Sequence, residues 1–159
     1  PAEDGIRDVL LSLVGSEMCI RDRLKPDGLA LIQAILMPDR RYEAYRRSVD
    51  FIQQYIFPGG LLPSLGRIAE CVADHTDLHQ LDLEDLTPHY ATTLEHWRRR
   101  FDANEEEIAA LGMPEVERRK WRYYFGYCEG AFLERAVGVA QLLYAKPDYR
   151  RSIPEVDRF

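Results

Sequence analysis

One cysteine and two histidines have a spacing that could bind a metal ion. Cys71, His75 and His79 recur every four residues, so on one continuous helix they would share a face. The alternation of apolar and polar residues over Leu78–Leu86 instead places His79 in a strand, and no fourth ligand is evident nearby. The sequence therefore predicts no metal site.

A second chemical pattern is the aromatic run Tyr123, Tyr124, Phe125 and Tyr127. The face of an aromatic ring attracts positive charge, so such rings can stabilise a cation. Neighbouring positions of a helix point in different directions, which assigns most of these rings to the core or to the surface. Cys128, the residue after this run, is expected to be a small buried apolar residue.

Charge and composition exclude several classes of protein. The 159 residues carry a formal net charge of −6, which argues against general nucleic-acid binding, although Arg98–Arg100 and Arg118–Arg122 are locally basic. Three cysteines, odd in number and far apart, are typical of a reducing cytoplasm rather than of a disulfide framework. No apolar run approaches the roughly 20 residues of a membrane-spanning helix, so contact with lipid would occur from the surface.

The first half of the coherent sequence predicts a strand followed by helices. Leu29–Leu36 is a short, mostly apolar run, as in a buried strand of a largely parallel sheet. A helix is expected over Arg41–Gln54, because Tyr45, Val49 and Ile52 would share its apolar face. Ser64 is expected to cap a further helix that ends near Ala73. The residues expected to face inward from that helix are Leu65, Ile68, Ala69 and Val72.

The second half repeats the alternation of strands and helices. Leu78–Leu86 reads as a strand, and Thr87 and Pro88 suit the N-cap and first position of a helix that ends near Ala103. A longer helix over Glu115–Arg135 and a closing strand over Val137–Ala145 come next. This order predicts an α/β sheet. The sequence has no G-x-G-x-x-G turn, the usual nucleotide-binding element of a doubly wound sheet.

Four segments together resemble a known enzyme family. They are LKPDGLALIQAI (Leu24–Ile35), YRRSVDFIQQYIFPGGLLPS (Tyr45–Ser64), HYATTLEHWRRRF (His89–Phe101) and YYFGYCEGAF (Tyr123–Phe132). Their order and spacing are similar to those of cyclopropane-fatty-acyl-phospholipid synthases and mycolic acid cyclopropane synthases, over about Leu24 to Arg150. The resemblance implies a class I S-adenosylmethionine-dependent methyltransferase (Rossmann-like) fold, truncated here to its fifth, sixth and seventh strands. The S-adenosylmethionine contacts would lie upstream of Leu24.

The resemblance also implies a reaction and a cellular setting. In the family, a methyl group passes from S-adenosylmethionine to a cis double bond of a phospholipid acyl chain, and loss of a proton closes a cyclopropane ring. A bicarbonate ion assists that proton transfer. The chain would thus come from a bacterial cytoplasmic enzyme, peripheral to the inner membrane, that binds unsaturated phospholipid and could form a homodimer. A related lipid C-methyltransferase with a methyl-branched or methylene product, or an inactive fragment, are the alternatives.

Three residues match the bicarbonate site of the family. Tyr90 corresponds to a tyrosine that hydrogen-bonds the ion; the alternative is an aromatic residue packed against the sheet. Gln33 stands where the family usually has a histidine, and its amide cannot shuttle a proton as imidazole does. This difference favours methyl branching, unless Gln33 is only a paired core amide. Ile35 matches a position whose backbone completes the site.

The family's substrate channel has one counterpart in this sequence. Phe57, Pro58, Gly59 and Gly60 would form a wall of the acyl channel, or else a plain turn between helices. In a lipid-modifying enzyme the two arginine-rich clusters could also contact anionic headgroups. The glutamate and cysteine that complete the family's site would lie upstream of Leu24.

The first residues fit poorly with the rest of the chain. SLVGSEMCIRDR (Ser12–Arg23) resembles translated adapter or vector sequence, and the chain begins with Pro1 rather than with methionine. We therefore expect residues 1–23 to be a non-native segment and residues 24–159 to be the C-terminal part of a methyltransferase domain. A genuine amphipathic N-terminal helix is the alternative.

Overall fold

Three strands form one sheet in which the last strand lies between the first two. The computed structural model describes residues 22–152, in which β1 (Leu29–Leu36) and β2 (His79–Asp85) flank β3 (Gly138–Ala145). β3 is antiparallel to both neighbours. The α/β class is confirmed, but none of the described strand pairs is the parallel pair expected from the apolar β1 run. Except for Asp22 and Arg23, the segment expected to be non-native lies outside the described residues.

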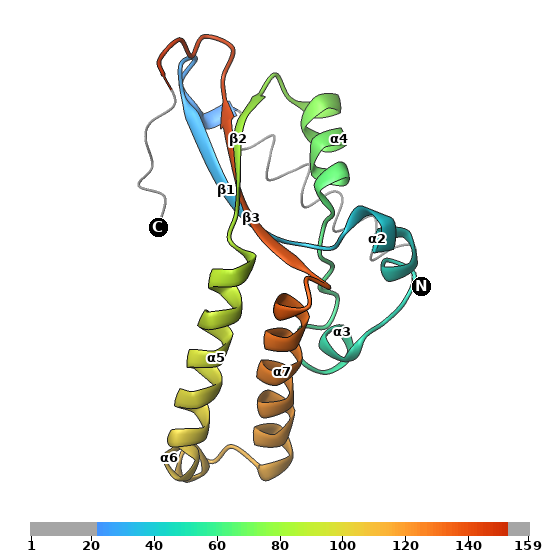
Figure 1. Ribbon diagram of the computed structural model, residues 1–159, viewed down its shortest axis with the longest axis vertical. Helices are drawn as coiled ribbons and strands as arrows, with labels where there is room; N and C mark the ends of the chain where they lie inside the picture. The colour runs from blue at the N-terminus through green and yellow to red at the C-terminus, as the bar shows by residue number, and fades with distance from the viewer. Residues whose placement is uncertain (1–21, 153–159) are drawn as a thin grey trace.

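The path of the helices explains this topology. α4 (Leu65–His75) connects β1 to β2, and these two strands run in the same direction. α5 (Thr87–Ala103) and α7 (Glu115–Leu133) then project from one end of the sheet as a helical hairpin, with the unpredicted α6 (Glu105–Ala110) at its tip (Figure 1). Since the hairpin returns the chain to the end of the sheet that it left, β3 runs antiparallel to β2.

The helix predicted over Arg41–Gln54 is in fact two short helices, α2 (Asp39–Tyr45) and α3 (Phe51–Tyr55). The Asp50 side chain accepts a hydrogen bond from the backbone N of Gln53 at 2.8 Å. The Gln53 side chain accepts one from the backbone N of Asp50 at 2.9 Å. This reciprocal pair is a capping box, which starts a new helix at a position where periodicity alone predicted continuation.

α4 begins where the sequence predicted. The Oγ atom of Ser64 accepts a hydrogen bond from the backbone N of Arg67 at 3.3 Å, which satisfies an otherwise unpaired donor of the first turn. The buried face of the helix consists of Ile68, Cys71 and Val72. Ala69, predicted to face inward, is exposed, as is Val49 in the connection between α2 and α3. The error at Ala69 follows from the assumed rotation of α4, which tertiary contacts decide, and the error at Val49 follows from the break between α2 and α3.

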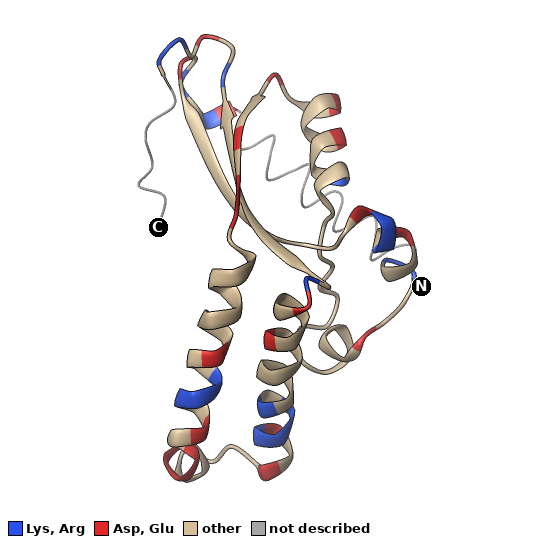
Figure 2. Cartoon of the chain, viewed as in Figure 1, with Lys and Arg blue, Asp and Glu red and all other residues tan. Residues whose placement is uncertain are grey.

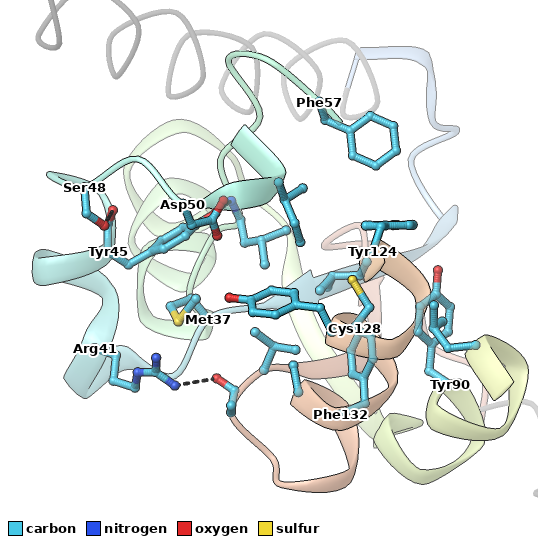
Figure 3. A pocket seen from close by; sticks show the side chains of 18 of the residues that line it. Met37, Arg41, Tyr45, Ser48, Asp50, Phe57, Tyr90, Tyr124, Cys128 and Phe132 are labelled. Carbon is cyan, nitrogen blue, oxygen red and sulfur yellow. Dashed lines mark hydrogen bonds between the residues drawn. The ribbon is translucent and has the colours of Figure 1, made fainter. Parts of the chain in front are cut away.

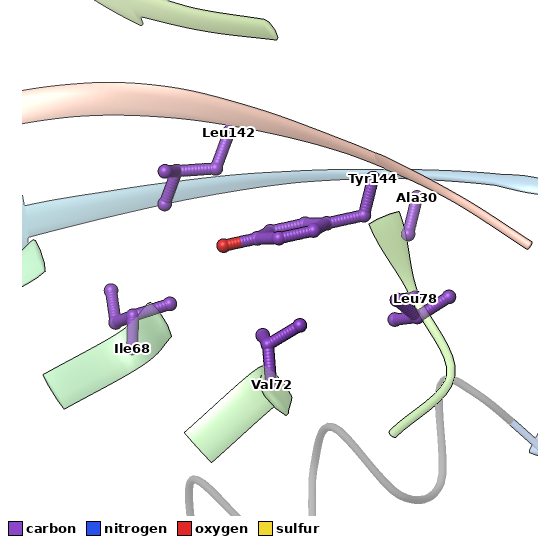
Figure 4. Packing of buried hydrophobic residues seen from close by; sticks show 6 residues of the cluster. All are labelled: Ala30, Ile68, Val72, Leu78, Leu142 and Tyr144. Atoms are coloured by element: carbon purple, nitrogen blue, oxygen red, sulfur yellow. The ribbon is translucent and has the colours of Figure 1, made fainter. Parts of the chain in front are cut away.

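Two apolar clusters hold the fold together. The first joins the sheet to α4 and contains six buried residues, shown in Figure 4: Ala30, Ile68, Val72, Leu78, Leu142 and Tyr144. The second joins the helical hairpin to the start of β3, through Ala91, Leu94, Phe125, Cys128, Phe132 and Val139. Ile35 of β1 packs against the second cluster, so this cluster connects the sheet with the hairpin.

A small polar junction links the hairpin to the sheet. The backbone N of Thr87 donates to Oδ1 of Asp85 at 2.9 Å, and Arg135 donates to Oδ2 of the same carboxylate at 2.6 Å. The Thr87 hydroxyl accepts from the backbone N of Val139 at 3.1 Å. The N-cap role predicted for Thr87 was therefore wrong: Thr87 is the first residue of α5, Leu86 is the N-cap, and the hydroxyl tethers β3.

This junction makes folding stability depend on acidity. Burial of the Asp85 carboxyl acts to raise its pKa, but the hydrogen bonds from Thr87 and Arg135 outweigh it and hold the pKa at about 2, below the ordinary 3.8. Because the folded-state pKa is depressed, the contribution is complete above the ordinary pKa and is lost as the pH falls towards about 2. We expect Asp85→Asn to lower the urea midpoint near neutral pH and to lose that effect as the folded pKa is approached. For the exposed control Asp148→Asn, the difference in urea midpoint from wild type should not shrink as the pH falls. A difference for Asp85→Asn that stays constant with pH would contradict the depressed pKa of Asp85.

Candidate active site

An amphipathic pocket of about 570 Å³ lies where β1, the α2–α3 region and the helical hairpin meet. Its wall is mostly apolar, and its deepest residues include Leu94 of α5 and Phe132 of α7, both almost fully buried. Polar groups enter from several elements, among them Arg41, Tyr45 and Asp50 (Figure 3). The pocket can therefore hold an apolar ligand and present polar groups to it.

Tyr90 lines this pocket from the first turn of α5. Its ring packs edge-on against Phe132 with centroids 4.9 Å apart, and against Trp97 at 6.3 Å. Among the described residues none hydrogen-bonds the Tyr90 hydroxyl. Burial raises the pKa of this phenol, with a smaller contribution from Cys128, so it remains a neutral donor at physiological pH. Tyr90 is thus packed against other aromatic residues, as in the alternative interpretation, and its hydroxyl is also available to a ligand.

The two β1 residues predicted for the site have different surroundings. Ile35 lines the pocket together with Tyr90. Gln33 is exposed, is not among the lining residues, and accepts a hydrogen bond from the side chain of its cross-strand neighbour Gln141 at 3.2 Å. Gln33 is therefore neither a buried core amide nor part of the pocket wall.

Of the four residues predicted to form a wall of the acyl channel, only Phe57 lines the pocket. Phe57 lines the pocket and meets Tyr124 edge-on, with centroids 5.8 Å apart. Pro58 and Gly59 come after it in a tight turn, in which the backbone N of Gly60 donates to the carbonyl of Phe57 at 3.0 Å. Gly59 has a φ of 81°, a conformation that favours glycine. The segment thus combines a wall residue with the plain turn that was its alternative.

The aromatic run of α7 divides between core, pocket and surface. Phe125 is buried against Phe101, and Tyr123 is 56% exposed. Tyr124 and Tyr127 line the pocket, where burial raises the pKa of both phenols. Two of the four rings, those of Tyr124 and Tyr127, therefore contribute to the pocket wall.

Cys128 also lines the pocket and is buried, as predicted. Burial raises the pKa of its thiol to about 11, against a smaller opposing effect of the Tyr124 hydroxyl. The thiol is therefore neutral at physiological pH and acts as an apolar wall group rather than as a nucleophile.

Sequence reasoning missed several polar wall residues. Tyr45 was assigned to an apolar helix face, but its hydroxyl accepts a hydrogen bond from the backbone N of Leu62 at 3.3 Å at the pocket wall. Asp50, Arg40 and Arg41 also line the pocket and had no predicted role. The only local signal was the capping pattern of Asp50 and Gln53, which marks a helix start rather than a site.

The metal and headgroup hypotheses have different outcomes. Within residues 22–152 no group of three or more histidine, cysteine or acidic side chains could hold a metal ion, and His79 starts β2, as predicted.

In the arginine-rich clusters, most basic groups already pair with carboxylates, and basic and acidic segments alternate along the hairpin (Figure 2). For example, Arg98 binds Glu129 at 2.7 Å and Arg122 binds Asp102 at 2.8 Å. These clusters hold the hairpin together and have little free charge for a headgroup.

The described residues fit a bicarbonate ion only in part. Tyr90 and Ile35 share the pocket, but Gln33 does not reach it. A small anion needs several converging donors, and the Tyr90 hydroxyl alone does not supply them. The described residues therefore do not form a complete bicarbonate site. Among the described helices, none is long and apolar enough to cross a bilayer.

Comparison with known sequences gives consistent matches. The family described as mycolic acid cyclopropane synthetase matches residues 18–142. The tuberculostearic acid methyltransferase UfaA1 of Mycobacterium tuberculosis is 44% identical over 118 residues, which cover 74% of this chain and 28% of that protein. The cyclopropane-fatty-acyl-phospholipid synthase of Escherichia coli is 34% identical over 124 residues, covering 77% and 30%. The chain thus spans less than a third of the length of these two relatives.

Comparison with solved structures agrees with the sequence matches. The crystal structure of mycolic acid cyclopropane synthase CmaA1 complexed with SAH and CTAB superimposes with a TM-score of 0.75 at 27% identity, covering 84% of this chain and 50% of that one. The described residues thus have the class I methyltransferase fold that the sequence predicted, over part of its length. The match over residues 18–142, the pocket and the shared fold together show that this chain belongs to the mycolic acid cyclopropane synthetase family of S-adenosylmethionine-dependent methyltransferases.

Proposed function

We propose that this chain forms the acyl-chain side of the active site of a lipid C-methyltransferase, whose substrate is a cis-unsaturated phospholipid acyl chain. The pocket carries the proposal: its wall is mostly apolar, and Tyr90 lines it on the side opposite Arg41. The S-adenosylmethionine contacts are proposed to lie upstream of Leu24. Family membership supports the reaction class.

The pocket residues suit methyl transfer to a double bond. The alkene carbon that receives the methyl group leaves its neighbour as a carbocation, which the ring faces of Tyr124 and Tyr127 can stabilise. The apolar walls formed by Leu94 and Phe132 exclude water, which would otherwise trap this cation. Tyr90 contributes a neutral hydroxyl that positions a proton acceptor. A base receives the proton, which leaves either from the added methyl group, closing a ring, or from a carbon next to the cation, giving a methyl-branched alkene. A hydride shift to the cation, followed by loss of a proton from the methyl group to the base, gives the methylene product.

We favour the methyl-branched or methylene product. Gln33 replaces the usual histidine and lies outside the pocket wall, so position 33 supplies no proton acceptor to the pocket. The relative named tuberculostearic acid methyltransferase is 44% identical to this chain, against 34% for the named cyclopropane synthase. Ring closure remains the second candidate, because the latter relative aligns over the larger share of the chain, 77%.

Lipid analysis of cells that express the complete gene product carrying this chain tests the function. Both products add one CH₂ unit to the acyl chain, so fragmentation must locate either a ring or a branch. Unsaturated acyl chains should be converted to the branched product only in expressing cells. An unchanged lipid profile, with soluble protein and S-adenosylmethionine present, would refute the proposal.

Changing Gln33 tests which residue controls the product. The side chain at position 33 lies outside the pocket wall, so we expect Gln33→His to leave the share of ring-containing product unchanged although it restores a titratable imidazole. Gln141→His places the same group on the neighbouring strand of the same sheet face and should also leave the product ratio unchanged. A severalfold rise in the ring-containing share for Gln33→His alone would show that position 33 directs proton loss.

A further inference from the structure

Two arginines line the otherwise mostly apolar pocket on its α2 side. Arg40 and Arg41 are exposed residues of α2 and both contribute to the wall. Figure 3 shows Arg41 on the opposite side of the pocket from Tyr90. The buried pocket residues Leu94 and Phe132 belong to the hairpin helices α5 and α7. One side of the pocket is therefore cationic and open to solvent, and the other is apolar and closed.

Among residues 22–152, no acidic side chain forms an ion pair with either of these two arginines. Arg41 donates one hydrogen bond, at 3.1 Å, to the carbonyl of Ala136, which orients its guanidinium and leaves most of its N–H donors for a ligand. This contrasts with Arg46 and Arg47 directly after the same helix, which both bind Glu43.

The acidic groups around α2 have other partners. Oδ1 of Asp39 accepts from the backbone N of Gly66 at 2.9 Å. Glu43 binds Arg46 and Arg47. Asp50 accepts from the backbone N of Gln53 in its capping box. An incoming anion would therefore meet two guanidinium groups without an ion-pair partner among the described residues, and one carboxylate, Asp50, that is held in a capping box.

We propose that Arg40 and Arg41 form an anion subsite that binds the carboxylate or phosphate group of an amphipathic ligand whose hydrocarbon chain extends toward Tyr90. Guanidinium groups match carboxylate and phosphate oxygens through paired hydrogen bonds. This inference rests on the proposed function, since it requires an acyl chain in the pocket. It fixes the direction of that chain: the charged group lies at α2, and the reacting part lies at the hairpin.

Binding measurements on the complete gene product test the subsite. The probes are oleate, oleoyl lysophosphatidate, uncharged oleyl alcohol and inorganic phosphate, measured by titration calorimetry. The double variant R40Q/R41Q is compared with R46Q/R47Q, which changes the net charge equally but outside the pocket wall. We expect R40Q/R41Q to weaken binding of the two charged lipids by about 30-fold, as for loss of charge-assisted hydrogen bonds, with oleyl alcohol unaffected. The control variant should bind all the probes as wild type does.

Each outcome separates this inference from the proposed function. A larger loss for oleate than for oleoyl lysophosphatidate would identify a carboxylate as the natural group, and the reverse would identify a phosphate. Equal weakening of oleyl alcohol, or an equal loss in R46Q/R47Q, would overturn the subsite and leave the acyl pocket standing. Tight binding of inorganic phosphate alone would overturn the amphipathic ligand. If wild type binds none of the lipids, the proposed function itself fails.

Discussion

Replacing Tyr90 by phenylalanine should lower methyl-transfer turnover by about 100-fold, as for the loss of one positioned hydrogen-bond donor in an active site. Tyr90 lies at the end of the pocket with its hydroxyl unpaired among the described residues, and its raised pKa keeps the proton on the oxygen. The ring contacts with Phe132 and Trp97 remain in the variant, so the pocket shape should be preserved. The measurement is the rate of methyl transfer to unsaturated phospholipid by the complete gene product.

Tyr123→Phe is the matched control for this change. Tyr123 is on the same hairpin but is 56% exposed and does not line the pocket. Its variant should keep wild-type turnover, while both variants should unfold at the wild-type urea concentration. Turnover of Tyr90→Phe within twofold of wild type would remove this hydroxyl from the proposed chemistry and leave Tyr90 as a packing residue.

Replacing Leu142 by alanine should destabilise the fold by about 3 kcal/mol, as expected when a large buried side chain is truncated. Leu142 lies in the central strand β3, has no solvent exposure, and packs between the sheet and α4 (Figure 4). β3 holds both other strands, so a cavity at this position weakens the packing on which the entire sheet depends. Urea unfolding followed by circular dichroism measures the effect.

Leu111→Ala makes the same chemical change at a surface position. Leu111 directly succeeds α6 and is 83% exposed, so its variant should differ from wild type by less than about 0.5 kcal/mol. Similar unfolding midpoints for Leu142→Ala and Leu111→Ala would contradict the position of the core between β3 and α4.

Local signals predicted many of the elements correctly. The bounds of β1, Leu29–Leu36, agree with the apolar run, and the cap at Ser64 is confirmed. Prediction was wrong where a local pattern had two possible outcomes. Apolar spacing favoured one helix over Arg41–Gln54, whereas the capping box at Asp50 starts a second helix. Thr87 has the residue type of an N-cap, but a distant backbone group, the N of Val139, binds its hydroxyl.

The sequence predicted only part of the site, because contacts between distant segments decide which side chains line the pocket. Family motifs identified Tyr90, Ile35 and Phe57, which do line one pocket. They also identified Gln33, which the fold leaves outside that pocket and pairs with a neighbouring strand. Arg41 had no motif to mark it, because its place at the pocket depends on how α2 packs beside the hairpin.

By itself the sequence determined the α/β class, most of the helix and strand bounds, and the family, since motifs, periodicity and caps act between residues close in the chain. Only the tertiary structure decided that β3 lies between β1 and β2 and that most arginines of the hairpin are neutralised, whereas Arg40 and Arg41 have no ion-pair partner within residues 22–152. The reason is physical: sheet order and ion pairing depend on contacts between residues distant in sequence. Those contacts form only when the helical hairpin and α2 pack against the sheet.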